Sequence, residues 1–118
     1  MHRGSARGWL HISDAVRAIE AAAGVEEHAV INIGHPEVTP IEDLAEGLRA
    51  RLDAAPSLIT LNDLPARMTA AKQPSLGRMR DLLGVTPKVS LDKGLDRVVA
   101  RVRARLAQIP AQAQETPA

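Results

Sequence analysis

The sequence predicts a small α/β domain with a few short strands and about four helices. Its 118 residues are about the length of one domain. Apolar residues make up 45% of the chain and charged residues 25%, and both values are typical of a globular protein. Short segments rich in β-branched residues alternate with longer segments of helical periodicity. The expected order is strand, helix, strand, helix, strand, helix, helix.

The first helix is expected to follow a short extended segment. Residues 1–8 hold three Gly or Ser residues and two arginines, and are expected to form a flexible lead-in. Residues 9–12 are a candidate strand. Ser13 or Asp14 can then cap a helix over residues 15–23, which the following glycine ends.

A second strand and helix are expected in the next part of the chain. Residues 29–33 are rich in β-branched side chains and read as a strand. Thr39 and Glu42 match a capping box, and Pro40 would occupy the first helical position. A helix is therefore expected to begin here and to end near Asp53.

The third strand is expected at residues 58–61, before a polar, irregular segment at residues 62–74. Ser75 can cap a short helix that Gly84 closes. Residues 86–89 are expected to be extended, because the segment contains a proline.

The last helix is expected to begin after Ser90, its cap, and to end at Pro110. Residues 9–109 would form the domain, and residues 110–118 a disordered tail. Three arginines recur every four residues on this helix. The pattern favours a solvated face that pairs with Asp92 and Asp96. These arginines are Arg97, Arg101 and Arg105.

Composition excludes several kinds of chemistry. The chain has no cysteine, tyrosine or phenylalanine, so it offers no thiolate and no tyrosine acid or base. Trp9 is its only aromatic residue, which argues against a stacking platform for nucleic acid. The glycines lack the spacing of a dinucleotide-binding or P-loop motif, and the histidines lack that of a zinc site.

Charge and hydropathy suggest a cytoplasmic protein. The net charge of +1 predicts no general attraction to nucleic acid or to acidic membranes. No apolar run approaches the length of a membrane span, and no secretory leader is visible.

A few side chains remain as candidates for binding. Arg7 and Arg67 lie in irregular segments, where a guanidinium can grip phosphate with two hydrogen bonds. His11 alternates with Trp9 along an extended segment, so it is either a structural histidine or a ligand contact. Three serines occupy expected helix caps, which favours capping over a nucleophilic role: Ser13, Ser75 and Ser90.

Four blocks of sequence resemble one known family. Arg-Gly-Trp-Leu-His-Ile-Ser-Asp at residues 7–14 resembles the Arg-Asp-Phe-Ile-His-Val-Asp-Asp segment of the NAD-dependent epimerase/dehydratase family, and an Ala-rich helix follows it at residues 15–23. Asn-Ile-Gly at residues 32–34, followed by Thr-Pro-Ile-Glu-Asp-Leu-Ala at residues 39–45, resembles the next block. Residues 82–95 resemble the closing Leu-Gly-Trp-x-Pro-x-x-Ser-Leu-Glu-Glu-Gly-Leu. The blocks run in the family's order from residue 7 to residue 106.

The resemblance implies a C-terminal substrate-binding subdomain of an extended short-chain dehydrogenase that acts on nucleotide sugars. The Rossmann domain and the Tyr-x-x-x-Lys pair lie upstream in the family. No catalytic, cofactor-binding or metal-binding residue is therefore expected here, and NAD(P) is expected only in a complete member or a partner chain. Such a chain would be inactive alone, as a fragment or as one chain of a split enzyme. The alternative is a non-catalytic interaction module that self-associates through the former domain interface.

The family's substrate residues can be carried over only in part. By resemblance, Arg7 would contact the diphosphate of a nucleotide sugar, and Arg67 or, alternatively, Lys72 would supply a second cation. His11 falls in the same binding segment. Four positions depart from the family pattern: Gly8, Ser13, Ser75 and Val85.

Without the Rossmann domain, part of the apolar surface is expected to be exposed. The candidates are the helix that carries Val16 and Ile19, and the segment 29–33. A Rossmann-domain chain or a second copy of this chain would cover it.

Overall fold

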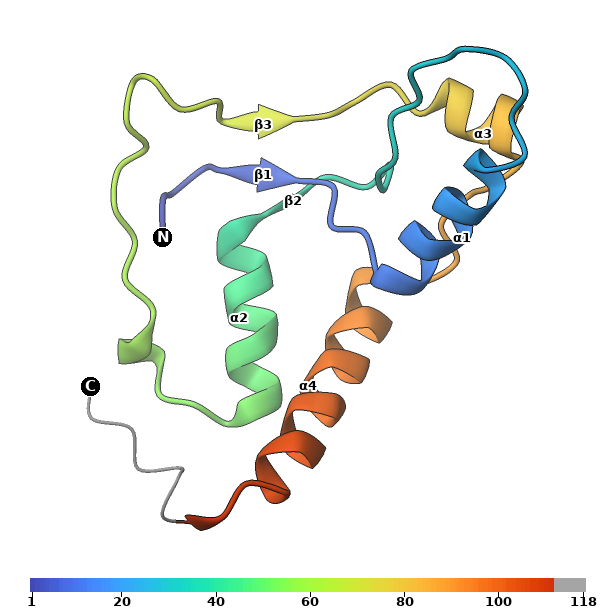
Figure 1. Ribbon diagram of the computed structural model, residues 1–118. Coiled ribbons are helices and arrows are strands. Elements are labelled where there is room, and N and C mark those ends of the chain that lie inside the picture. Colours follow the sequence, from blue (N-terminus) through green and yellow to red (C-terminus); the bar gives the residue numbers. More distant parts are fainter. Residues whose placement is uncertain (112–118) are drawn as a thin grey trace.

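The computed structural model describes residues 1–111 and confirms a small α/β fold. The elements in chain order are β1 (Ala6–Arg7), α1 (Ile12–Ala22), β2 (Thr39–Pro40), α2 (Ile41–Leu52), a 3₁₀ turn η1 (Pro56–Leu58), β3 (Ala71–Lys72), α3 (Gly77–Leu83) and α4 (Leu91–Ala107) (Figure 1). Most of the expected tail, residues 112–118, lies outside the described residues. No described helix is long and apolar enough to cross a membrane.

The sheet is small and is built from distant parts of the chain. β1 lies between β2, to which it is antiparallel, and β3, to which it is parallel. The strand predicted at residues 9–12 is wrong, because the strand lies at residues 6–7 and α1 already begins at Ile12. Residues 1–8, the expected lead-in, thus hold the central strand.

The strands predicted at residues 29–33 and 58–61 are also wrong. A strand needs a neighbouring backbone to bond with, and residues 29–33 have no such ladder within the described chain. Side chains hold this segment instead: Arg78 donates to the Val30 carbonyl and Asn32 to the Ser75 carbonyl. Residues 56–58 form η1, and the backbone beyond it bonds to the N-terminal residues.

Three of the predicted helix starts need correction. His11 caps α1, because its Nδ1 accepts the backbone N–H of Ser13. The predicted capping box is absent, since Thr39 lies in β2 and Glu42 accepts the Gly4 N–H at 2.6 Å. α3 has no side-chain cap, so Ser75 does not act as predicted.

The helix ends and the last cap are confirmed. Asp53 follows α2 in the left-handed conformation, with φ 50°. Gly84 closes α3 at φ 62°, where the absence of a side chain removes the steric cost. Ser90 caps α4, with its Oγ accepting the Lys93 N–H at 3.3 Å. α4 ends at Ala107, before Pro110.

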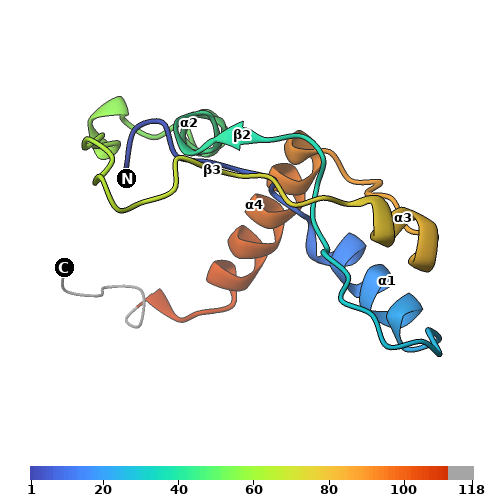
Figure 2. The ribbon, with the colours of Figure 1, turned by 90° about the horizontal axis from the view of Figure 1, so that it is seen from above.

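The core is divided between two places. A cluster of Ala18, Met79, Leu83 and Val85 joins α1 to α3. The buried residues of α4, which include Leu95 and Val99, lie on the side of the α2–α4 contact. The radius of gyration is 17.7 Å, whereas a compact domain of this length is expected near ~13.5 Å. The fold is therefore open, and Figure 2 shows α1 with α3 at one end and α2 at the other.

One buried carboxylate joins the first helix to the segment that leads into the last. Asp14 is 1% exposed. It accepts the backbone N–H groups of Lys88 at 3.1 Å and Val89 at 3.0 Å, and its Oδ1 lies 3.0 Å from NH1 of Arg17. Burial raises the pKa of the Asp14 carboxyl, but the hydrogen bonds from Val89, Lys88 and Arg17 outweigh it and hold this pKa below its ordinary value. Asp14 thus acts as a tertiary clamp.

Candidate functional site

The sheet brings two of the predicted binding residues together. In the parallel pairing of β1 with β3, Arg7 lies directly opposite Lys72. In the antiparallel pairing on the other side, Arg7 lies opposite Thr39. Residues paired across strands point to the same face of a sheet, so this register places two cations on one face. The two residues are far apart in the sequence, and only the sheet makes them neighbours.

The Arg7 guanidinium also orders the loop before β3. Its NH1 donates to the Ala6 carbonyl at 2.6 Å and to the Ala70 carbonyl at 3.4 Å, and its NH2 donates to the Thr69 carbonyl at 3.4 Å. The Ala6 N–H in turn donates to the Ala70 carbonyl at 2.7 Å. Arg7 is half-buried, which holds the guanidinium in one place. An arginine fixed in this way keeps a permanent charge at the edge of the loop.

The other predicted cation is less constrained. Arg67 lies in an exposed turn a few residues before β3. The turn is closed by a hydrogen bond from the Met68 N–H to the Pro65 carbonyl at 2.9 Å. Lys72 is exposed as well. Arg7 is therefore the most constrained of the three cations, whereas Arg67 and Lys72 are both exposed.

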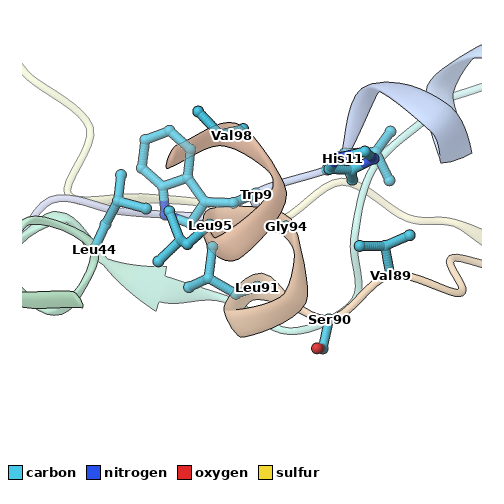
Figure 3. Close-up of a pocket in the computed structure, with 10 residues that line it drawn as sticks. Trp9, His11, Leu44, Val89, Ser90, Leu91, Gly94, Leu95 and Val98 are labelled. Carbon is cyan, nitrogen blue, oxygen red and sulfur yellow. The ribbon is translucent and has the colours of Figure 1, made fainter. Parts of the chain in front are cut away.

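The structure places His11 at the start of α1. Its Nδ1 lies 2.7 Å from Ser13 Oγ and accepts the Ser13 N–H at 3.2 Å, so the ring caps α1. The ring edge faces Gly94 on α4, where an added Cβ would lie 3.3 Å from His11 Cδ2. Figure 3 shows His11 at one end of a cavity whose lining is mainly apolar. The structure gives His11 a capping and packing role.

This cavity has a volume of about 180 Å³ and lies between the extended segment after β1, α2 and α4. Trp9 lies along it and donates from Nε1 to the Thr39 carbonyl at 3.2 Å, which fixes the indole. The lining residues are Trp9, Leu10, His11, Leu44, Val89, Ser90, Leu91, Gly94, Leu95 and Val98 (Figure 3). The volume suits one apolar group and is too small for a nucleotide sugar.

Sequence reasoning missed the role of one residue beside Arg7. Gly8 stands where the family pattern has Asp. A Cβ on Gly8 would overlap the carbonyl oxygen of His35, so the loop after residue 33 crosses the backbone too closely for a side chain. The glycine itself was the available signal, because a glycine next to a strand often marks close backbone contact.

Within residues 1–111 no group of three or more His, Asp or Glu side chains could hold a metal ion.

The apolar surface expected to be exposed is indeed exposed. Ile12, Val16, Ile19 and Val30 have between 46% and 74% of their surface accessible. The first three follow one face of α1, on the side away from the buried Ala18. We call these four residues the α1 surface. An exposed apolar face of this kind is typical of an interface.

Comparison with known proteins supports the resemblance at the level of fold. No family model matches the chain, and no curated protein matches it. Several solved structures do match the chain. A UDP-glucose 4-epimerase from Thermotoga maritima, solved with UDP-glucose, aligns with a TM-score of 0.75 and 26% identity over 87% of this chain. A UDP-glucuronic acid 4-epimerase from Bacillus cereus, solved with NAD, aligns with a TM-score of 0.71 and 24% identity over 92% of this chain.

A dTDP-glucose 4,6-dehydratase from Bacillus anthracis, in complex with NAD, aligns with a TM-score of 0.73 and 20% identity over 85% of this chain. These alignments cover only 33%, 33% and 32% of the respective relatives, so the chain spans about a third of their length. The resemblance noted from the sequence is thereby confirmed: the chain has the fold of a portion, about one third, of an NAD-dependent epimerase or dehydratase of the extended short-chain dehydrogenase type.

Proposed function

We propose that this chain is the nucleotide-sugar-binding part of an NAD-dependent epimerase or dehydratase and is inactive by itself. A separate cofactor-binding part, in the same polypeptide or in another, would supply NAD(P) and the catalytic tyrosine and lysine. The 118 residues contain no tyrosine, so the chain cannot provide that acid or base.

The observation that carries this proposal is the β1–β3 register, which aligns Arg7 with Lys72. A diphosphate carries two adjacent negative charges, and a planar guanidinium matches two of its oxygens. The ordered Arg7 would orient the diphosphate, while Lys72 and Arg67 would add charge from mobile side chains. His11 would act indirectly, by holding the start of α1.

The α1 surface supports the need for a second part. Four large apolar side chains are exposed to solvent, and the radius of gyration is large for a chain of this length. Burial of apolar surface is the main favourable term in association, so a cofactor-binding domain would gain stability by covering it.

The test is titration of UDP-glucose and dTDP-glucose into the full chain, followed by calorimetry and by NMR shifts. We expect weak, saturable binding that Lys72→Ala or Arg7→Ala reduces by about tenfold, which is the loss expected for one charge-assisted contact. Lys93→Ala removes an exposed lysine on α4 and should leave binding unchanged. Lys72→Ala is the more specific variant, because Arg7→Ala also removes the hydrogen bonds from Arg7 to the loop before β3 and could change its structure.

Two further measurements complete this test. The chain should bind NAD weakly or not at all, and should show no turnover of either sugar nucleotide when NAD is added. Sub-micromolar binding of NAD, or sugar-nucleotide binding that neither variant changes, would contradict the proposal.

A second candidate function is favoured by the α1 surface itself: a non-catalytic module that self-associates through it. Sedimentation would then show a dimer that Ile19→Glu dissociates. Leu58→Glu changes an apolar position in η1 that is even more exposed than Ile19; it is the matched control and should not change the mass. A dimer with no affinity for sugar nucleotides would favour this module over the first proposal.

A further inference from the structure

A second apolar surface runs along α4, apart from the sheet and from the α1 surface. α4 packs against α2 (Figures 1 and 2). Arg51 near the end of α2 binds Asp92 and Asp96 in the first half of α4, and Arg103 in the second half donates to the Arg51 carbonyl at 2.9 Å. Leu95 and Val99 are buried in this contact. Val98, Val102 and Leu106 follow one another at four-residue spacing and are each about half exposed. With a rise of ~1.5 Å per residue, these three span about 12 Å of helix surface.

The apolar cavity lies at the beginning of this row. Val98 is part of both, since it lines the cavity together with Trp9 and Leu95 (Figure 3). We call the cavity and the row of Val98, Val102 and Leu106 the α4 groove. An apolar space of ~150 Å³ can hold a benzene ring, so a cavity of about 180 Å³ has room for one large apolar side chain.

Arginines line one edge of the α4 groove. Arg97, Arg101 and Arg105 each precede a residue of the apolar row by one position, so they follow it along the helix. The pairing expected with Asp92 and Asp96 is absent, because both of these acids bind Arg51 on α2, at 3.2 and 2.6 Å. No ion pair or side-chain hydrogen bond joins any of the three arginines to residues 1–111.

We infer that the α4 groove is a docking site for an acidic amphipathic helix of another protein. A large apolar side chain of that helix would fill the cavity, further apolar side chains would cover Val102, and Glu or Asp residues would face the arginines. Charge complementarity selects this occupant, since the groove carries three cations along one edge and residues 97–111 contain no acid. The inference is independent of the proposal on nucleotide sugars.

Two other occupants fit less well. A second copy of the chain, placed symmetrically, would bring the same arginines face to face. An anionic membrane would use the charge but not the cavity, and interfacial helices typically insert Trp, Phe or Leu rather than the two valines that lead this row.

The probe is a synthetic peptide of about 16 residues that forms an amphipathic helix of Leu, Ala and Glu, compared with the same peptide in which Lys replaces Glu. Trp9 is the only aromatic residue of the chain and lines the cavity, so its fluorescence reports directly on the site. The acidic peptide should shift the Trp9 emission saturably, with a Kd of about 10–100 μM, as is reasonable for one short helix. The basic peptide should not.

Three variants sharpen the test. Val102→Glu should weaken the acidic peptide at least tenfold, whereas Ala100→Glu, an exposed position on the opposite face of α4, should not. Reversal of the three arginines to Glu should transfer binding from the acidic to the basic peptide. This gain of binding cannot result from unfolding, and far-UV circular dichroism of each variant provides the control.

Four results would overturn the inference. The first two are equal binding of the acidic and the basic peptide, and no shift of the Trp9 emission with either peptide. The third is a shift of the Trp9 emission with phosphatidylserine vesicles instead of the peptide. The fourth is self-association of the chain that Val102→Glu abolishes and that the acidic peptide does not displace.

Discussion

Replacement of Asp14 is the most direct test of how this open fold is held together. Its carboxylate connects α1 to the segment before α4, through the N–H groups of Lys88 and Val89 and the guanidinium of Arg17. We therefore expect Asp14→Ala to lower the free energy of unfolding by far more than an ordinary change on a helix.

The magnitude follows from the three contacts. Val89 is buried, so its unpaired N–H would cost about 2 kcal/mol, and that of the more exposed Lys88 about 1 kcal/mol. The partly exposed ion pair with Arg17 adds ~0.5 kcal/mol. Asp14→Ala should thus cost about 3–4 kcal/mol. Asp14→Asn keeps one acceptor oxygen and should cost about half of that.

The assay is urea unfolding at neutral pH, followed by far-UV circular dichroism and Trp9 fluorescence. Glu20→Ala removes an exposed acid from the same helix and should change the unfolding free energy by less than ~0.5 kcal/mol. If Asp14→Ala unfolds the chain outright, Asp14→Asn still provides a measurable difference. A loss below ~0.5 kcal/mol for both Asp14 variants would refute the reasoning.

The same clamp predicts a pH dependence. The Asp14 pKa lies below its ordinary value of 3.8 in the folded chain, so the unfolded chain binds the proton more readily. Its stabilising effect is fully present above 3.8 and is lost as the pH falls from there through the folded pKa. The stability difference between the wild type and Asp14→Asn should therefore shrink over this acid range, as measured by urea unfolding at several pH values. A difference that is constant with pH would show that charge is not involved.

Two further predictions concern single positions. Gly8→Ala should destabilise the chain by about 2–3 kcal/mol in thermal melts, because its Cβ would overlap the His35 carbonyl. The control is Gly77→Ala in α3, where an added Cβ has no atom within 4 Å, and this change should be neutral or stabilising. Ser90→Ala should cost about 1 kcal/mol as the loss of a helix cap, whereas Ser75→Ala should cost nothing measurable, because α3 has no side-chain cap. Equal effects of the two serine changes would contradict this assignment of the caps.

The helices were largely predictable because their hydrogen bonds are local. Ser90 lies within a few residues of the backbone N–H that it caps, and Gly84 directly follows the helix that it ends. The residues that begin or end a helix can therefore be recognised in a short stretch of sequence. The end of α2 at Asp53 was predictable for the same reason. Where a local signal failed, as for Glu42, a distant group had taken its place: the N–H of Gly4.

The strands were not predictable from their residues. Residues 29–33 have the composition of a strand and find no partner within the described chain, whereas Ala71–Lys72 has no such composition and pairs with β1. Pairing depends on which backbone lies alongside, and that is a property of the whole fold.

The candidate site, like the fold, was predictable only in part. The residues alone predicted a binding role for Arg7, through the resemblance to a nucleotide-sugar family, and predicted the exposed apolar face of α1. The contacts that place Lys72 beside Arg7, that make His11 the cap of α1 and that join Asp14 to the segment before α4 are visible only in the folded structure. Each of these depends on contacts between residues distant in the chain, or on a choice between rival local partners. Such contacts are selected by the packing of all elements together, which no short segment encodes.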